Sequence, residues 1–321
     1  MTALPSLQSP TSLAIEAHLD GKPPYKDGES LRITGLATAC DRRLWYSYRW
    51  AHKSFSPEAR QRRLIESDMS RKAEIITLLM NAGLKVQTRD PQTWFKFSAR
   101  MAGGHLTTFF DGTATMVPEA PVTTHLLQIR IYSRKDWENW RRKGIRESEP
   151  SYFIKAQLGM RALGLTRALI VAENRDTKEI EAERISYDAA LATAHEARAE
   201  RIALADSPPA RISDDPDFWE CRFCPAREVC HGAAEARRNC RTCLASCVSE
   251  GGWGCARHGV DLSAEEQRQG CAVHLYIPDL VPGDQIDADE AACTVTYRMP
   301  DGSTWIDGPQ ASDPRLDAAG E

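Results

Sequence analysis

Residues 221–230 read CRFCPAREVC, in which three cysteines follow the spacing C-x2-C-x5-C. Two thiolates separated by two residues can turn around one metal centre, and a third cysteine further along can close the loop. Cys221, Cys224 and Cys230 therefore predict a metal site, and such a site needs a fourth ligand.

Cys40 is the candidate for this fourth ligand, because it stands alone in an aromatic and basic segment. Of the 10 cysteines, only Cys40 and Cys293 lie outside residues 221–271. Scattered core thiols would not cluster in this way, and a reducing compartment disfavours disulfides. The alternatives are a zinc knuckle confined to the loop and cysteines that occur there by chance. Spacing alone does not separate zinc from an iron–sulfur cluster.

The composition is that of an ordinary globular protein, with 321 residues, 42% hydrophobic and 27% charged, enough for one core and an appendage or for two domains. A net charge of -4 argues against a chain that is basic throughout, but it allows a local basic groove. The N-terminus lacks the pattern of a secretory signal, and the most apolar internal run, residues 168–172, is too short to span a bilayer. We therefore expect a cytoplasmic protein without a membrane segment.

The order of predicted elements indicates an α/β domain over residues 29–232, followed by a Cys/His-rich module over residues 233–308. Residues 1–28 are rich in Ser, Pro and Gly and are expected to be flexible, and residues 309–321 are expected to form a polar tail. Apolar periodicity predicts helices over residues 67–81, 135–143, 150–163 and 188–205. Alternating or short apolar runs predict strands over residues 84–88, 94–99, 105–116, 126–132, 167–172 and 180–186.

Between the cysteines, this order resembles the PD-(D/E)XK nuclease superfamily in its iron–sulfur branch. That branch includes CRISPR-adaptation exonucleases, helicase–nuclease subunits and related phage proteins. The resemblance covers about residues 31–232 and rests on the cysteine spacing and on the motif Phe109-Phe110-Asp111-Gly112. It implies a restriction-endonuclease-like core, with a mixed central sheet flanked by helices. It also implies a [4Fe–4S] cluster on Cys40, Cys221, Cys224 and Cys230.

The resemblance also implies site residues for cleavage assisted by Mg²⁺ or Mn²⁺. Asp111 matches the metal-binding aspartate of the family, Glu74 its helical acid, and Gln157 a helical glutamine that contacts DNA. The next strand should read (D/E)-x-K, but here it contains Gln128 and Arg130. Gln128 offers a carbonyl oxygen without charge, whereas Arg130 stays protonated and can bind phosphate. Taken singly, each of these residues is also typical of an ordinary turn or exposed surface.

The second cysteine group follows residue 232. It contains NCRTCLASC and two C-x2-H pairs, so it offers more metal-binding residues than one tetrahedral site needs. Such a zinc module either contacts DNA or a partner, or merely holds together a segment too small to fold alone. We expect zinc on four cysteines, with His258 or His274 as substitutes: Cys240, Cys243, Cys255 and Cys271.

Two basic clusters are candidates for DNA contacts, because arginines grip phosphates and aromatic rings stack on unpaired bases. A solvated helix face with packed tryptophans explains the second cluster equally well. The first cluster comprises Arg60, Arg62 and Arg63. The second comprises Arg134, Lys135, Arg141, Arg142 and Lys143, interleaved with Trp137 and Trp140.

The sequence therefore predicts a metal-dependent deoxyribonuclease that acts on single strands or ends of DNA, alongside DNA-repair, recombination or phage-replication proteins. The alternative is a catalytically inactive relative that binds DNA or a partner and keeps the cluster as a structural element. Gln128 and Arg130 favour this alternative, while Asp111 and Glu74 favour the enzyme. A redox sensor is a third possibility, but the sequence contains no flavin or nicotinamide signature to support it.

Overall fold

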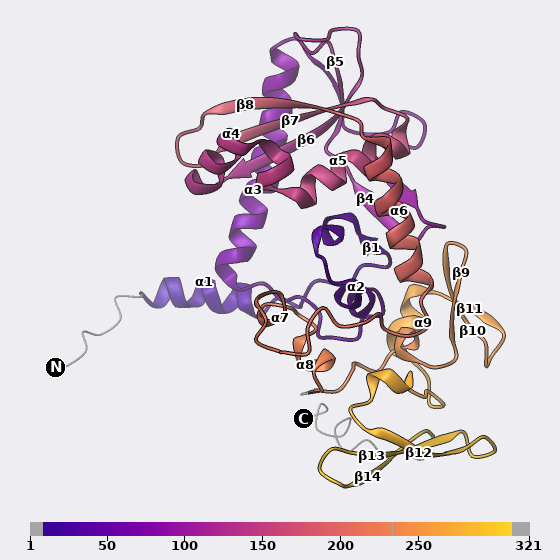
Figure 1. The fold of residues 1–321 in the computed structure, drawn as a ribbon. Coiled ribbons are helices and arrows are strands. Elements are labelled where there is room, and N and C mark those ends of the chain that lie inside the picture. Colours follow the sequence, from indigo (N-terminus) through magenta and orange to yellow (C-terminus); the bar gives the residue numbers. More distant parts are fainter. Residues whose placement is uncertain (1–8, 233, 310–321) are drawn as a thin grey trace. The chain divides into compact units, whose positions relative to one another are not determined.

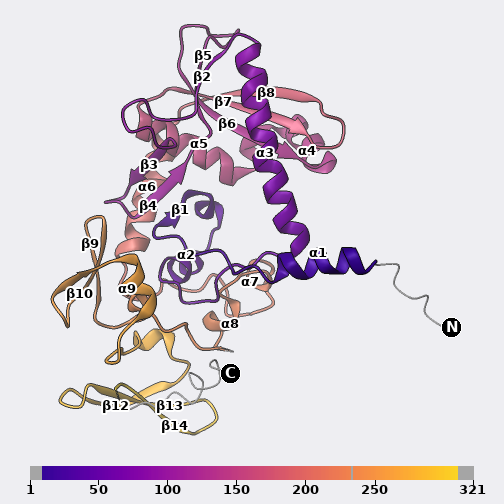
Figure 2. The same ribbon diagram turned by 180° about the vertical axis from the view of Figure 1, so that it is seen from behind.

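The computed structural model describes residues 9–232 and 234–309, whose elements are labelled in Figure 1 and Figure 2. The chain separates into two compact units. The first unit contains Ser54–Ala99, Thr108–Thr193 and the segment before residue 28. The second contains Gly28–Lys53, Arg100–Thr107 and the chain from Ala194 onward. Both the early and the late cysteines fall in the second unit.

A five-stranded mixed sheet with the order β2-β5-β6-β7-β8 forms the centre of the first unit. β6 and β7 are parallel, and the other neighbouring pairs are antiparallel. α5 provides the crossover that two parallel strands need. The strands are β2 (Lys85–Gln87), β5 (Gly112–Thr115), β6 (His125–Tyr132), β7 (Arg167–Asn174) and β8 (Ile180–Ser186). The helices are α1 (Pro10–Asp20), α3 (Ala59–Asn81), α4 (Arg134–Ser148), α5 (Pro150–Leu163) and α6 (Ala189–Leu204), which continues into the second unit.

Helices cover both faces of this sheet (Figure 1). The odd-numbered residues of β6 from position 127 to 131 pack with Ile75 of α3. Leu126 and Tyr132, on the other face, pack against α4 and α5. Because side chains alternate along a strand, Gln128 and Arg130 share the face of Leu126. The expectation of a mixed α/β fold with helices flanking the sheet is thus confirmed.

The strand expected over residues 105–116 is two strands that belong to different sheets. β4 (Leu106–Phe109) lies between β1 (Leu31–Arg32) and β3 (Ser98–Met101), whereas β5 joins the central sheet. Gly112 begins β5 with a φ of 152°, and a Cβ there would overlap the carbonyl oxygen of Gln87 in β2. Only glycine allows this close approach. Asp111 precedes this glycine and lies between β4 and β5, where the chain passes from one sheet to the other.

The flexible N-terminus expected over residues 1–28 contains a helix, α1, while residues 1–8 lie outside the described residues. Ser9 caps α1 by accepting a hydrogen bond from Ser12 N at 3.2 Å, and Pro10 opens the first turn. Asp20 accepts a hydrogen bond from the backbone nitrogen of Ala59 at 2.7 Å, which ties α1 to α3. Ser and Pro are also typical of helix starts, so the expectation of flexibility was wrong for residues 10–20. The expected tail beyond residue 309 is likewise outside the described residues.

The second unit combines short helices with two further three-stranded sheets, β11-β10-β9 and β12-β13-β14. Its helices are η1 (Ile33–Ala37), α2 (Asp41–Tyr48), α7 (Trp219–Arg222), α8 (Arg227–Cys230), η2 (Cys240–Thr242), α9 (Ala264–Gln269) and η3 (Pro278–Leu280). Its strands are β9 (Ser246–Ser249), β10 (Gly252–Cys255), β11 (Val260–Leu262), β12 (Asp284–Asp289), β13 (Thr294–Arg298) and β14 (Thr304–Asp307).

Two buried arginines hold the centre of the second unit together. Arg49 donates hydrogen bonds to the carbonyl oxygens of Arg241 and Ala205, each at 2.9 Å. Arg241 donates to the carbonyl oxygen of Tyr48 at 2.8 Å, and its guanidinium lies 3.7 Å from the ring centre of Trp50. Burial lowers the pKa of Arg49 to about 10 and that of Arg241 to about 9. Carbonyl oxygens and aromatic faces replace water around these cations, and they join the α2 segment to the C-terminal cysteine module.

Candidate active site

Asp111 is fixed against the central strand β6 and is paired with a cation from α3. The Nζ atom of Lys72 donates to both carboxylate oxygens of Asp111, at 3.0 and 3.1 Å. The Oδ2 atom of Asp111 also accepts a hydrogen bond from the backbone nitrogen of Ile129 at 2.8 Å. Gly112 pairs with Leu127 across the ladder, which places the Asp111 carboxylate beside the peptide that follows Gln128.

Gln128 is a buried amide without a hydrogen-bond partner among the described residues. Its side chain is 1% exposed, and neither its Oε1 nor its Nε2 atom is bonded. An unpaired buried polar group costs about 1–3 kcal/mol. Such a group is expected to bind a water or a ligand, and its carbonyl oxygen suits a hard divalent cation. It brings no charge to that cation.

Arg130 is held by a carboxylate in this structure. Its Nε and Nη2 atoms donate to the two oxygens of Glu149, both at 3.0 Å, and its guanidinium lies 3.4 Å from the ring centre of Tyr152. Tyr132 donates to Glu149 as well, at 3.1 Å. The planar fork that was expected to bind phosphate is therefore occupied, and a phosphate contact requires Arg130 to leave Glu149.

Lys155 of α5 is a site residue that the sequence analysis missed. Burial lowers the pKa of Lys155 to about 8; Asp111 opposes this shift, while Lys72 and Arg130 add to it. Its Nζ atom lies 5.9 Å from the ring centre of Phe110, the residue before Asp111. A lone lysine inside the apolar stretch of α5 was the sequence signal. A lysine with such a pKa can exchange a proton near neutral pH.

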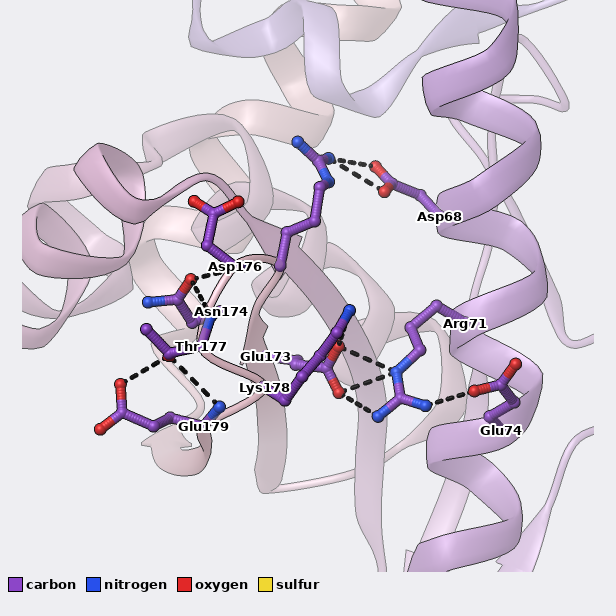
Figure 3. Close-up of polar contacts among 10 residues, drawn as sticks. Asp68, Arg71, Glu74, Glu173, Asn174, Asp176, Thr177, Lys178 and Glu179 are labelled. Atoms are coloured by element: carbon purple, nitrogen blue, oxygen red, sulfur yellow. Dashed lines mark hydrogen bonds and ion pairs between the residues drawn. The ribbon is translucent and has the colours of Figure 1, made fainter.

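Glu74 belongs to a different set of contacts from Asp111. It pairs with Arg71, whose Nε atom donates to both oxygens of Glu173 at 2.8 Å. Glu173 lies near the end of β7 and is fully buried. Figure 3 shows Arg71 reaching from α3 to both carboxylates. It is Lys72 of α3 that meets Asp111, so the structure does not bring Glu74 to Asp111 as the expected second acid.

Gln157 has a structural position instead of a DNA-facing one. Its side chain is fully buried. Its Nε2 atom donates to the carbonyl oxygen of Ser186 at 2.9 Å, and its Oε1 atom accepts from the backbone nitrogen of Asp188 at 2.7 Å. The amide thus joins the end of β8 to the segment that begins α6. The expected contact with DNA is incompatible with this burial.

The first cysteine group is gathered in the second unit. Cys40 precedes α2, and its Sγ atom accepts a hydrogen bond from the backbone nitrogen of Arg43 at 3.4 Å. Burial raises the pKa of the Cys221 thiol, and the nearby Cys40 and Cys230 raise it further. Burial and the same two thiols also raise the pKa of Cys224. All ten cysteines of the chain are free thiols.

The second cysteine group lines one pocket of about 230 Å³. Burial raises the pKa of Cys240 to about 11, with further contributions from three neighbouring thiols. His274 is fully buried; its Nε2 atom lies 3.1 Å from the carbonyl oxygen of Asn239, and its Nδ1 atom has no partner among the described residues. The cysteines and histidines around the pocket are Cys240, Cys243, Cys255, His258, Cys271 and His274, and Glu266 also lines it.

Within residues 9–232 and 234–309, no three His, Cys, Asp or Glu side chains are arranged so that they could hold a metal ion. In the same described part of the chain, no helix has the length and apolar character needed to cross a membrane.

The tryptophans of the second basic cluster are not available for base stacking. Arg62 is buried and donates to the carbonyl oxygens of Pro57 and Lys22, both at 3.0 Å. Trp137 and Trp140 are 2% and 4% exposed and pack into the core beneath α4. The tryptophans of the second cluster are thus packed as the alternative expected, while its arginines and lysines are exposed.

Comparison with known proteins gives weak similarities only. No protein-family model matches the chain, and no curated protein matches it in sequence. Among solved structures, SSO0001 aligns with a TM-score of 0.34 and 12% identity over 70% of this chain and 96% of that chain. An alkaline exonuclease (LHK-Exo) from Laribacter hongkongensis aligns with a TM-score of 0.34 and 16% identity over 59% and 90%. LHK-Exo in complex with dAMP gives a TM-score of 0.33. Similarity at this level carries no argument about fold or function.

Proposed function

We propose that the protein is a Mg²⁺- or Mn²⁺-dependent DNA nuclease that acts on single strands or ends, with Asp111 as its metal-binding carboxylate. One observation carries this proposal: the Asp111 carboxylate is held against β6 next to Gln128, whose buried amide has no partner. Gln128 offers a carbonyl oxygen from β6, and Asp111 offers carboxylate oxygens from the position just before β5, the strand next to β6. The resemblance of the sequence to the iron–sulfur branch of PD-(D/E)XK nucleases supports the same conclusion.

A bound divalent cation would polarise the scissile phosphate and activate the attacking water. Asp111 and Gln128 are the residues that would hold it, and together they provide a single negative charge. Mg²⁺ is usually held by one or two carboxylates together with substrate phosphates, so this site needs the DNA to complete it. Lys72 would leave Asp111 when the cation binds, and its charge would then be available to the phosphate.

The other cations of the site would act on charge and protons. With a pKa of about 8, Lys155 exists in both protonation states near neutral pH and is suited to deliver a proton to the leaving oxygen. Arg130 lies on the same strand as Gln128, and its positive charge would become available to a phosphate once it leaves Glu149. The site thus contains more positively charged side chains than negatively charged ones.

A catalytically silent DNA-binding protein is the second candidate. It is favoured by the fact that Lys72 and the Ile129 backbone already engage the carboxylate of Asp111. A site with this balance of charge binds a phosphate without needing a metal.

One experiment separates the two candidates. The full chain, purified without oxygen, is incubated with end-labelled single-stranded DNA and Mn²⁺. We expect degradation that is lost in Asp111→Ala and kept in Asp284→Ala, which removes an exposed aspartate of β12. DNA binding without cleavage in Mg²⁺ or Mn²⁺ would instead establish the silent protein.

The first cysteine group is proposed to hold a [4Fe–4S] cluster on Cys40, Cys221, Cys224 and Cys230. The proposal is supported by the effect of Cys40 and Cys230, which both raise the pKa of Cys221 and of Cys224. Cys40 lies far from the others in sequence, so the cluster would fasten the start of α2 to the α7–α8 segment. Its role would be structural.

The second group is proposed to bind one Zn²⁺ through Cys240, Cys243, Cys255 and Cys271, with His274 able to replace one of them. The shared pocket supports this, and so does the unpartnered Nδ1 atom of His274. We expect zinc as well as iron in the purified protein. Cys243→Ser should lose the zinc and keep the iron, whereas loss of neither metal would contradict the assignment.

A further inference from the structure

Two adjacent aromatic side chains project from the loop between β2 and β3. Trp94 is 74% exposed and Phe95 is 75% exposed. Single exposed apolar residues are common, but two large neighbouring rings at this exposure are unusual for a soluble surface. Such a surface is expected to bind a ligand or a partner.

The loop that carries these rings is built by hydrogen bonds around Asp90. The Oδ1 atom of Asp90 accepts from the backbone nitrogens of Gln92 and Thr93, at 2.7 and 3.3 Å. The backbone nitrogen of Trp94 donates to the carbonyl oxygen of Asp90 at 2.8 Å, and Asp90 N donates to the carbonyl oxygen of Phe95 at 2.9 Å. The rings are therefore presented by an ordered turn.

Trp94 also has a strained backbone. Its φ is 60°, in the left-handed region that bulky residues rarely adopt. Its carbonyl oxygen accepts a hydrogen bond from the Nη1 atom of Arg89 at 2.9 Å. The fold maintains this conformation although it leaves the indole ring in solvent, and strain of this kind is concentrated at binding sites.

The loop leads directly to the candidate active site. Phe97, which follows the exposed pair, is buried, and its carbonyl oxygen accepts from the backbone nitrogen of Phe110 at 2.9 Å. Phe110 precedes Asp111 in the chain. Phe109, on the same segment, is 63% exposed. Exposed rings thus lie on both of the segments that are hydrogen-bonded to each other just before Asp111.

The charges of the loop suit a nucleic acid. Arg89 and Lys96 are exposed, and they face each other across an isolated antiparallel bridge. The only carboxylate between them, that of Asp90, bonds to backbone nitrogens within the loop. Aromatic rings beside cations are the combination with which proteins bind single strands, because the rings stack on bases and the cations contact phosphates.

We propose that Trp94 and Phe95 form a stacking platform for unpaired bases of single-stranded DNA beside Asp111. The proposal rests on the proposed function for the identity of the nucleic acid and specifies how single strands would be preferred. A duplex keeps its bases stacked on one another and offers nothing for these rings to cover. Single strands and frayed ends offer free base faces.

The test is a comparison of binding to a labelled single-stranded oligonucleotide and to its duplex, measured by fluorescence anisotropy without added divalent metal. In the double variant Trp94→Ala/Phe95→Ala, we expect affinity for the single strand to fall roughly tenfold or more. Affinity for the duplex should stay nearly unchanged. Val122→Ala, which truncates a side chain that is 97% exposed, serves as the control. Trp94→Tyr should retain most of the affinity, because it keeps an aromatic face.

Equal losses on both DNAs, or no loss on either, would overturn the platform. A change in oligomeric state on gel filtration with unchanged DNA affinity would also overturn it and would assign the rings to a second copy of the chain. Cleavage is measured separately with Mn²⁺ and Asp111→Ala. If the protein does not cleave DNA but the double variant loses affinity for the single strand, the stacking platform is supported and the proposed nuclease activity is ruled out.

Discussion

The Nζ atom of Lys72 lies 3.0 and 3.1 Å from the two carboxylate oxygens of Asp111, so a cation of the protein occupies the atoms that a divalent ion would need. Their side chains are 27% and 21% exposed, which leaves the pair accessible to solvent. Lys72 and a divalent cation therefore compete for the same carboxylate.

Removing this competitor should strengthen metal binding. In Lys72→Met, we expect the Mn²⁺ concentration that half-saturates cleavage to fall about fivefold, since a partly exposed ion pair is worth about 1 kcal/mol. The measurement is a Mn²⁺ titration of single-strand degradation. Lys85→Met, at an exposed lysine of β2, should behave like the parent protein. A higher Mn²⁺ requirement in Lys72→Met would show that Lys72 supports the metal site.

Gln128→Glu should supply the charge that the site lacks. We expect the variant to bind Mn²⁺ at least about tenfold more tightly than the parent protein, because the metal would then bind a second carboxylate. Without metal, the buried carboxylate should lower the midpoint of thermal unfolding, and Mn²⁺ should restore it. Gln128→Leu is the control; it should be at least as stable as the parent protein, because it removes an unpaired buried amide, but unresponsive to Mn²⁺. Unfolding of Gln128→Glu that is insensitive to Mn²⁺ would place the metal elsewhere.

The pKa of Lys155 predicts a pH-dependent contribution to stability. Burial holds this pKa at about 8, below the ordinary value of 10.5, so the unfolded chain binds more protons between these two values. Charged Lys155 thus opposes folding below about pH 8, and the penalty disappears as the pH rises towards 10.5. Lys155→Met should stabilise the protein most below about pH 8 and not at all above about 10.5.

Thermal unfolding of the parent protein and of Lys155→Met over this pH range checks the prediction. Lys135→Met, at an exposed lysine of α4, should show no such trend. A stability difference that is constant with pH would mean that Lys155 is no more protonated in the unfolded chain than in the native protein.

The buried hydrogen bonds of Gln157 predict a loss of stability without a loss of DNA binding. Gln157→Leu leaves the carbonyl oxygen of Ser186 and the backbone nitrogen of Asp188 without their partner, which costs about 1–3 kcal/mol. Chemical denaturation should show this loss, while DNA affinity below the unfolding transition stays unchanged. Gln61→Leu, at an exposed position of α3, should change neither. Weaker DNA binding by folded Gln157→Leu would contradict this prediction and support the DNA contact that the family resemblance implies.

Cys40 should be required for the iron content. Cys40→Ser removes the one cluster ligand that comes from the N-terminal part of the chain, so we expect most of the iron and sulfide to be lost while zinc remains. Iron, sulfide and zinc are measured after purification without oxygen. Cys247→Ser, at an exposed thiol, should keep all three. Full iron content in Cys40→Ser would mean that the cluster, if present, has another fourth ligand.

The central sheet was largely predictable from the sequence because its signals are local. β6 and β7 are apolar runs with a helical stretch between them, and that arrangement by itself specifies a parallel pair joined by a crossover. The break at Asp111 was not predictable, because residues 105–116 are rich in threonine and phenylalanine, which are typical of one continuous strand. Only the close approach of Gly112 to β2 shows that two sheets share this segment.

The sequence by itself determined which residue types are available: one carboxylate at Asp111, a neutral Gln128, and cysteines in ligand spacing. Tertiary structure decided which of them meet. Lys72 and Glu74 are two positions apart on α3, so they point in nearly opposite directions around the helix axis, and packing selected Lys72 for Asp111. In the same way, packing buried Trp137 and left Trp94 in solvent. Periodicity specifies local structure, whereas contacts between distant segments depend on how the elements pack.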